Sequence, residues 1–253
     1  MFPEERRQWL VSRARTAGRL DVAEVSDELN VAVETIRRDL NLLESHGLLR
    51  RVHGGAIPVE RVGFEGALAA RAGAMRDEKI RLAKAAADLI DDAESIYLDE
   101  GSTVQVLADL LPVDRPLTVV TNALPTAVAL AARPNVSLYV LGGRVRNHTL
   151  GAVDHWATRM LGDLFIDLAF LGTNGISVER GLTTPDPAVA AVKATAVAAA
   201  RRSVLVADST KFGVDSFCRF AGVRDLEAIV TDPGLDAGGA AAYAACGVRV
   251  VQA

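Results

Sequence analysis

The sequence predicts an α/β protein made of a small helical domain followed by a larger open parallel sheet with helices on both faces. Up to residue 56, short amphipathic segments alternate with turns. From residue 77, short runs rich in Val, Leu and Ile alternate with helix-length segments, a pattern typical of βαβ units. We therefore expect domains at residues 1–57 and 77–253, joined by a linker at 58–76 that lacks strong periodicity.

The N-terminal segment has the order of a winged helix-turn-helix. A charged helix follows Pro3, and Gly18 ends it. A second helix opens with Leu20, Asp21 and Val22 and runs through Leu29, and Asp21 is a suitable N-cap. A third helix is expected over residues 34–47, where Ile36, Leu40 and Leu43 share one apolar face. The run LLRRVHGGA then predicts a strand, a tight glycine turn and a second strand.

The polar face of the third helix is suited to meet DNA. Arg can pair with guanine edges or phosphate, and Asn can pair with adenine in the major groove, while a basic hairpin can follow the backbone or the adjacent minor groove. Asp39 and Glu44 would neutralise part of this field. A solvated charged helix with a surface hairpin is the alternative that these residues leave open. The candidate DNA-binding residues are Thr35, Arg37, Arg38, Asn41, Arg50, Arg51 and His53.

The C-terminal segment predicts alternating helices and strands. The expected strands have the sequences SIYLD, LTVVTN, SLYVLGG, LAFLG, SVLVAD, AIVTD and VRVV. Helices are expected before the first strand (EKIRLAKAAADLI), after Ser102, in PTAVALAA, near residues 152–163, and from Asp186 to Arg202. The last of these is almost all Ala and Val apart from Lys193, which suggests burial at a subunit contact.

Polar clusters follow the predicted strands, where ligands bind in open α/β sheets. Gly101, Ser102 and Thr103 offer close backbone approach, hydroxyls and a helix start, which together suit an anion. Arg144 and Lys211 could add charge-assisted hydrogen bonds, and Asp99 and Asp208 suit sugar hydroxyls. Any one cluster could also be an ordinary βα turn.

Composition excludes several classes of protein. The formal net charge of -4 does not favour nucleic acid, so the case for DNA rests on where the arginines lie. The two cysteines, Cys218 and Cys246, form no motif and fit a reducing cytosol. The chain has no signal-peptide run, no apolar span of membrane length and no nucleotide-binding or metal motif. We expect a cytoplasmic protein with no membrane contact, no metal and no cofactor.

The N-terminal motifs resemble a known family. TIRRDLNLLESHGLLRRVHGGA, with LDVAEVSDELNVA before it, is similar to the signature of DeoR-family transcriptional regulators. The resemblance implies a sequence-specific regulator, usually a repressor, that binds double-stranded operator DNA as a homodimer or homotetramer. One departure is Ala32, where the family usually has a serine that can cap the helix or contact phosphate.

The C-terminal clusters resemble the DeoR sensor domain over about residues 77–232, a domain similar in fold to ribose-5-phosphate isomerase and glucosamine-6-phosphate deaminase. The resemblance implies a pocket for a phosphorylated sugar. FLGTNGISVERGLTTPDPAVAAVK is similar to a subgroup from high-GC bacteria that governs sugar uptake and fructose use, which makes fructose 1-phosphate or fructose 6-phosphate the preferred effector. The expected effector-binding residues are Asp99, Gly101, Ser102, Thr103, Asn122, Gly142, Gly143, Arg144, Gly172, Asp208 and Lys211.

Two other functions compete with this interpretation. An active sugar-phosphate isomerase or deaminase could use Asp99, Asp208 and Lys211 as an acid/base set. Against it, no histidine follows a predicted strand, since His148 and His155 fall in or near a helix, and an enzyme has little use for residues 3–56. An activator or a nucleotide-responsive regulator is the other alternative.

Overall fold

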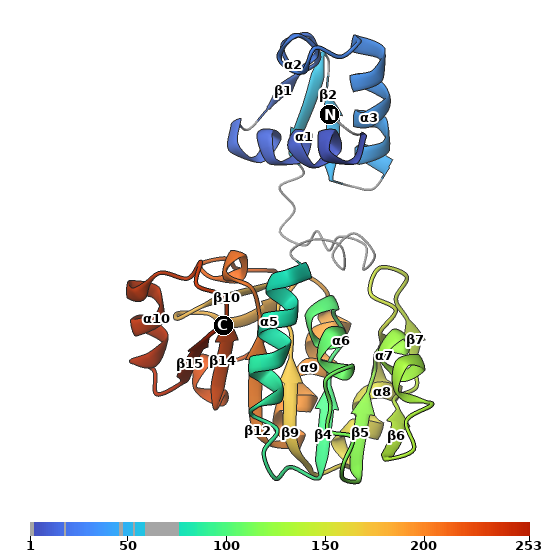
Figure 1. The fold of residues 1–253 in the computed structure, drawn as a ribbon, viewed down its shortest axis with the longest axis vertical. Helices are drawn as coiled ribbons and strands as arrows, with labels where there is room; N and C mark the ends of the chain where they lie inside the picture. The colour runs from blue at the N-terminus through green and yellow to red at the C-terminus, as the bar shows by residue number, and fades with distance from the viewer. Residues whose placement is uncertain (1–2, 18, 46–47, 53, 59–75) are drawn as a thin grey trace. The chain divides into compact units, whose positions relative to one another are not determined.

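The computed structural model describes residues 3–17, 19–45, 48–52, 54–58 and 76–253. The chain forms two compact units, Met1–Gly66 and Ala67–Ala253 (Figure 1). Apart from its two end residues, the expected linker at 58–76 lies outside the described residues.

The described part of the N-terminal unit contains three helices. They are α1 (Pro3–Ala17), α2 (Val22–Leu29) and α3 (Val33–Ser45). The predicted apolar stripe of α3 is buried, and Ile36, Leu40 and Leu43 pack with Leu10 of α1 in one core. Asp21 caps α2 as expected, because its side chain accepts hydrogen bonds from the backbone N–H groups of Ala23 and Glu24.

A small antiparallel sheet completes this unit. Its strands are β1 (Leu20–Asp21), β2 (Leu49–Val52) and β3 (Gly55–Pro58), in the order β1-β3-β2. Leu20 and Asp21 pair with β3, so α2 begins at Val22 with Asp21 as its N-cap, and Leu20 lies in a strand where a helix start was predicted. Two glycines make the hairpin possible. Gly54 has a φ of 78°, and a Cβ on Gly55 would lie 1.9 Å from the carbonyl oxygen of Leu20.

The C-terminal unit contains the predicted open parallel sheet. Every neighbouring pair of strands in this seven-stranded sheet is parallel. The strand order is β15 (Arg249–Gln252), β14 (Ala228–Thr231), β12 (Ala200–Val206), β9 (Ile166–Leu171), β4 (Ser95–Leu98), β5 (Leu117–Thr121) and β6 (Val136–Val140). The chain runs outward from β4 through β5 to β6 and then returns to the other side of β4 as β9. The strand order therefore reverses between β4 and β9, the point at which open α/β sheets bind ligands.

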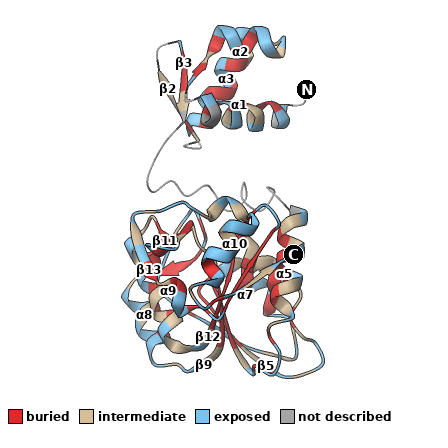
Figure 2. Ribbon diagram, turned by 90° about the vertical axis from the view of Figure 1, so that its left-hand side faces the viewer, coloured by how far each residue is buried: buried red, intermediate tan, exposed pale blue. Residues whose placement is uncertain are grey.

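Helices cover both faces of this sheet (Figures 1 and 2). One face packs against α5 (Arg76–Ala87), α6 (Ser102–Ala108) and α7 (Leu124–Leu130). The other packs against α8 (His155–Gly162), α9 (Pro187–Ala199) and α10 (Ala237–Ala244). Figure 2 shows the strands buried between these layers, as expected for continuous Val/Ile/Leu runs in a parallel sheet.

Several elements differ from the sequence prediction. The helix expected from Asp186 to Arg202 ends at Ala199, and β12 begins directly at Ala200. The helix expected near residues 152–163 begins only at His155, because β8 (Ala152–Val153) pairs with β7 (Arg144–Val145) in a hairpin. A second antiparallel sheet, not predicted, consists of β10 (Gly175–Ser177), β11 (Gly181–Thr184) and β13 (Cys218–Ala221). Two 3-10 turns lie at Ser209–Lys211 and Val223–Asp225.

Candidate DNA interface and effector site

The outward face of α3 carries most of the candidate DNA-binding residues. Arg37, Arg38 and Asn41 are exposed, whereas Thr35 is half-buried. The Arg37 guanidinium lies 3.5 Å from the Glu34 carboxylate, an exposed pair that is worth little in water. Because the opposite face of α3 is buried in the core, the helix presents these residues together on its outward face.

Asp39 does not lie on this face, so the expectation that it weakens the positive field there is wrong. Its carboxylate is buried and accepts a hydrogen bond from Arg6 Nε at 2.6 Å. Arg7 Nε lies 3.7 Å from its other oxygen. Asp39 therefore ties α3 to α1, and two of the arginines of α1 are used inside the fold.

The hairpin is tied to α3 through Arg51. Its backbone N–H donates to Glu44 Oε1 at 2.7 Å, and its guanidinium donates to the side-chain oxygen of Asn41. Glu44 thus holds the hairpin, although it also adds negative charge. Of Arg50 only the backbone is described, paired with Ile57, and His53 lies outside the described residues.

Ala32 is exposed, and its backbone carbonyl accepts hydrogen bonds from the N–H groups of Thr35 and Ile36 at the start of α3.

In the sensor unit, Asp99 stands at the reversal of strand order. It follows β4, is fully buried, and its Oδ2 accepts from the backbone N–H of Gly172, which follows β9, at 2.9 Å. Lys193 of α9 donates to the same oxygen, and its Nζ also donates to the Gly172 carbonyl at 3.0 Å. The other oxygen of Asp99 is buried without a hydrogen-bond partner among the described residues. Lys193 is therefore buried within its own chain, beside the predicted effector residues.

Glu100, the next residue, joins two further elements. Its Oε2 accepts from the Thr149 hydroxyl at 2.8 Å, and its Oε1 lies 3.7 Å from the Arg146 guanidinium. Arg146 Nε also lies 3.2 Å from Asp186, which caps the N-terminus of α9. We call Asp99, Glu100, Arg146, Thr149, Gly172, Asp186 and Lys193 the Asp99 cluster. It holds β4, the hairpin after β6 and α9 together at the carboxyl edge of the sheet.

Asn122 supports the neighbouring part of this edge. The Tyr97 hydroxyl donates to its side-chain oxygen at 2.9 Å, and its amide nitrogen donates to the Ala152 carbonyl at 3.1 Å. Burial, and then the negative charges of Asp99 and Glu100, raise the pKa of Tyr97 well above its usual range. Tyr97 therefore stays protonated and remains a donor. Both side-chain groups of Asn122 are used within the protein, so its role here is to hold the hairpin strand β8.

The loop after β4 leads directly into α6. Gly101 has a φ of 137°, a conformation that favours glycine, and its carbonyl accepts from Gln105. Ser102 is buried and Thr103 is half-buried. These residues adjoin Asp99 and Glu100 in the chain, as the sequence predicted.

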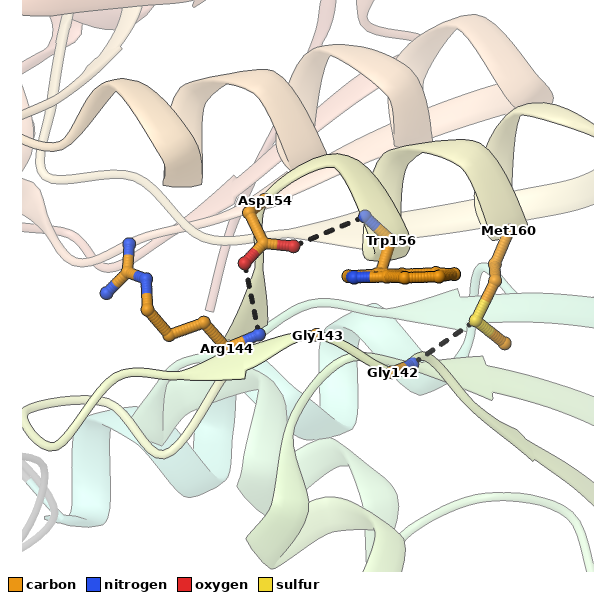
Figure 3. Close-up of a pocket in the computed structure, with 6 residues that line it drawn as sticks. All are labelled: Gly142, Gly143, Arg144, Asp154, Trp156 and Met160. Atoms are coloured by element: carbon orange, nitrogen blue, oxygen red, sulfur yellow. Dashed lines mark hydrogen bonds between the residues drawn. The ribbon is translucent and has the colours of Figure 1, made fainter.

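Gly142, Gly143 and Arg144 line a separate open hollow of about 470 Å³ with Asp154, Trp156 and Met160 (Figure 3). Asp154 has a φ of 82°, and its carboxylate accepts from the backbone N–H groups of Arg144 and Trp156. Met160 Sδ accepts from the Gly142 N–H at 3.3 Å. The residues of the Asp99 cluster do not line this hollow.

Asp208 and Lys211 lie in the turn that follows β12. The Asp208 carboxylate accepts from the backbone N–H and the hydroxyl of Thr210, which closes the turn. Lys211 is half-buried, at the end of this turn. The two residues thus stand at a third place along the carboxyl edge.

Sequence reasoning missed Glu100, Arg146, Thr149 and Asp186, and it predicted the burial of Lys193 but attributed it to a subunit contact. Glu100 was within reach, because it follows Asp99 directly after a strand. Arg146 was harder to identify, since the hairpin that brings it to Glu100 was not predicted. His148 and His155 are exposed, as expected.

In the part of the chain that the structure describes, none of the helices has the length and hydrophobicity needed to span a membrane. No group of three or more His, Cys, Asp or Glu residues in that part could hold a metal ion.

Comparison with known proteins supports both units. Residues 6–62 match the DeoR-like helix-turn-helix domain, and residues 74–233 match the DeoR C-terminal sensor domain. The two units thus define a DNA-binding transcriptional regulator with a sensor domain. The chain belongs to the DeoR family.

Whole-length relatives agree with this assignment. The chain is 36% identical over 233 residues to an uncharacterized HTH-type transcriptional regulator, FruR, of Bacillus subtilis, covering 92% of each chain. It is 35% identical over 252 residues to the HTH-type transcriptional regulator GlpR of Haloferax volcanii, covering 100% of this chain and 98% of the relative. Among solved structures, ribose 5-phosphate isomerase A of Methanocaldococcus jannaschii matches 54% of each chain at 16% identity with a TM-score of 0.38.

Proposed function

We propose that this regulator represses genes of sugar uptake or catabolism, and that a phosphorylated sugar bound to the sensor unit changes its affinity for operator DNA. The proposal depends mainly on one observation: Asp99 and Gly172 meet at the reversal of strand order, with Lys193 beside them. Open α/β sheets bind ligands at this position.

The chemistry of this edge fits a sugar phosphate. Asp99 has a buried oxygen with no hydrogen-bond partner among the described residues, which suits a sugar hydroxyl. Lys193 and Arg146 are engaged within the Asp99 cluster. The cations Arg144 and Lys211, which also follow strands of the sheet, would be the charge-assisted partners of a phosphate. Fructose 1-phosphate and fructose 6-phosphate are the preferred effectors. The proposed contacts beside the Asp99 cluster are Asp99, Gly101, Ser102, Thr103 and Gly172, with Asn122 holding β8 next to them. The remaining proposed contacts lie at the two other places described above and are Gly142, Gly143, Arg144, Asp208 and Lys211.

On the DNA side, Arg37, Arg38 and Asn41 of α3 would read the major groove, with Thr35 at their margin. The hairpin arginines Arg50 and Arg51, with His53, would contact the backbone. Two or four copies would bind repeated half-sites in the cytoplasm. For the effector to act, it must bind the two states of the protein with different affinity, a coupling of about 1–3 kcal/mol.

The DNA half of the proposal is tested with the DNA upstream of the gene for this protein. Arg38→Ala should weaken binding by about 1–3 kcal/mol if the residue contacts a base, measured by fluorescence anisotropy at fixed salt. Arg13→Ala is the matched control, since Arg13 is an exposed arginine of α1 that pairs with Glu28. Equal affinity of the Arg38 and Arg13 variants would remove Arg38 from the interface.

The effector half is tested with Lys211→Ala, which should retain DNA affinity and lose at least part of the response to sugar phosphate. A normal response would move the phosphate to another cation, first to Arg144. We also propose that the protein has no isomerase or deaminase activity, because Asp99 and Lys193 are engaged with each other. Turnover of an aldose or ketose phosphate by the purified protein would contradict this.

A further inference from the structure

The edge of the sheet formed by β6 exposes apolar side chains and has no further strand beside it among the described residues. Within the described residues, β6 pairs with β5 alone, so the backbone groups along its outer side have no strand partner. The side chains of Tyr139 and Val140 at its end are exposed, Tyr139 by 57%. An exposed apolar edge strand is an aggregation hazard that proteins normally cover or charge.

Helices on both faces extend this apolar surface beyond the strand. On one face α7 packs against β6 and exposes Leu124 and Val128, the latter by 77%. On the other face α8 exposes Trp156, by 59%, and Met160, whose sulfur accepts from Gly142 just after β6. Figure 3 shows the Trp156 ring and Met160 lying beside Gly142 and Gly143. We call Leu124, Val128, Tyr139, Val140, Trp156 and Met160 the side face.

Charge along α7 and β6 favours an identical partner, whereas α8 carries the exposed Arg159 between Trp156 and Met160. Residues 124–132 and 136–143 contain no Asp, Glu, Lys or Arg. Two copies meeting here would therefore bring no like charges together along α7 and β6. The opposite edge strand, β15, differs because it carries Arg249, and the amide of its Gln252 donates to the Leu235 carbonyl.

The area is also sufficient for a dimer. The side-face residues expose on the order of 600 Å² per copy before the β6 backbone and the intervening alanines are counted, against about 800 Å² per partner in a standard interface. A two-fold axis beside β6 would place two β6 strands antiparallel and join the two sheets into one. Such an interface uses the same patch on both copies.

We infer that the side face is the surface through which two copies of the chain associate, with β6 pairing antiparallel across the two-fold axis. This inference rests on the proposed function only in assuming that more than one copy binds the operator. The occupant is a second copy of the sensor unit, because α7 and β6 carry no charged side chain, the exposed apolar area approaches that of a standard interface, and β6 has no outer strand partner among the described residues.

The test is sedimentation velocity of the full chain without DNA or effector at micromolar concentrations. The wild-type protein should be a dimer or tetramer. Tyr139→Lys and Val128→Lys should each raise the dissociation constant roughly tenfold or more and give smaller species. Phe217→Lys is the matched control. Phe217 is 72% exposed and lies just before β13, a strand of the β10-β11-β13 sheet and not of the side face, so this variant should keep the wild-type mass.

Two results would overturn the inference. One is a wild-type protein that is monomeric throughout this concentration range. The same result is expected if another part of the same chain covers the side face. The other is a wild-type mass for both side-face variants. Circular dichroism of each variant checks that the fold is intact, which is expected because the substituted side chains are exposed. Since DNA is absent, failure of the proposed regulatory function would leave this result unchanged.

Discussion

Replacing Lys193 by Met should destabilise the sensor unit strongly. The Lys193 side chain is 4% exposed and that of Asp99 is 0% exposed, so neither charge can turn to water when the other is removed. Met has a similar length and fills most of the same space. The variant leaves the Asp99 carboxylate with the Gly172 N–H and no cation. Removing one partner of a buried ion pair costs about 3–5 kcal/mol.

The assay is urea unfolding followed by far-UV circular dichroism. For a slope of about 2–3 kcal/mol/M, the urea concentration at the midpoint should fall by roughly 1–2.5 M. Lys84→Met, at an exposed position of α5, should change stability by no more than about 0.5 kcal/mol.

A double variant separates charge from packing. Lys193→Met combined with Asp99→Asn removes both charges and keeps an acceptor for the Gly172 N–H, so it should be more stable than Lys193→Met alone. A loss below about 1 kcal/mol in the single variant would refute the reasoning, as would a double variant less stable than the single one.

Two further predictions concern other parts of the chain. Gly55→Ala should destabilise the N-terminal unit by about 1–3 kcal/mol or more, because its Cβ would lie 1.9 Å from the backbone oxygen of Leu20. In the control variant Gly54→Ala the new Cβ meets no atom closer than 3.8 Å, so the positive φ alone should cost about 1–2 kcal/mol. Equal melting temperatures for the two variants would contradict this prediction. The hydrogen bond from the Ser95 hydroxyl lowers the pKa of Asp167. Partial burial raises this pKa, but hydrogen bonds from backbone N–H groups lower it further, so the net shift is downward. Asp167 therefore contributes stability above about pH 4 that is lost as the pH falls through its folded pKa, so Asp167→Asn should lower the melting temperature at pH 6 more than at pH 3, and an equal difference at both pH values would count against the assignment.

The fold was predictable where periodicity is strong. The spacing of Ile36, Leu40 and Leu43 defined the buried side of α3, and the positions of Arg37 and Arg38 on its exposed side followed. The buried strands were predictable because fully covered parallel strands read as continuous apolar runs. The short strands β7, β8, β10, β11 and β13 were missed, because segments of two to four residues have too little length to show a period.

The candidate site was only partly predictable, because its contacts are long-range. Asp99 and Gly172 could be expected together, since both follow strands of one parallel sheet. Lys193 could not be assigned to Asp99 from an Ala-rich helix, where any face might have been the buried one. The prediction that Asp39 weakens the positive field of α3 failed because a charged residue on a surface helix is normally solvated. Only the packing of α1 against α3 shows that Asp39 is buried and paired with Arg6.

The measurement that tests the central claim most directly is binding of the purified protein to its upstream DNA, titrated with a panel of sugar phosphates at fixed salt. We predict specific binding, and a change in affinity of tenfold or more, about 1.4 kcal/mol, with one compound, fructose 1-phosphate or fructose 6-phosphate first. Specific binding that no sugar phosphate alters would contradict the proposed effector class, and the absence of binding to any DNA would contradict the proposed function as a whole.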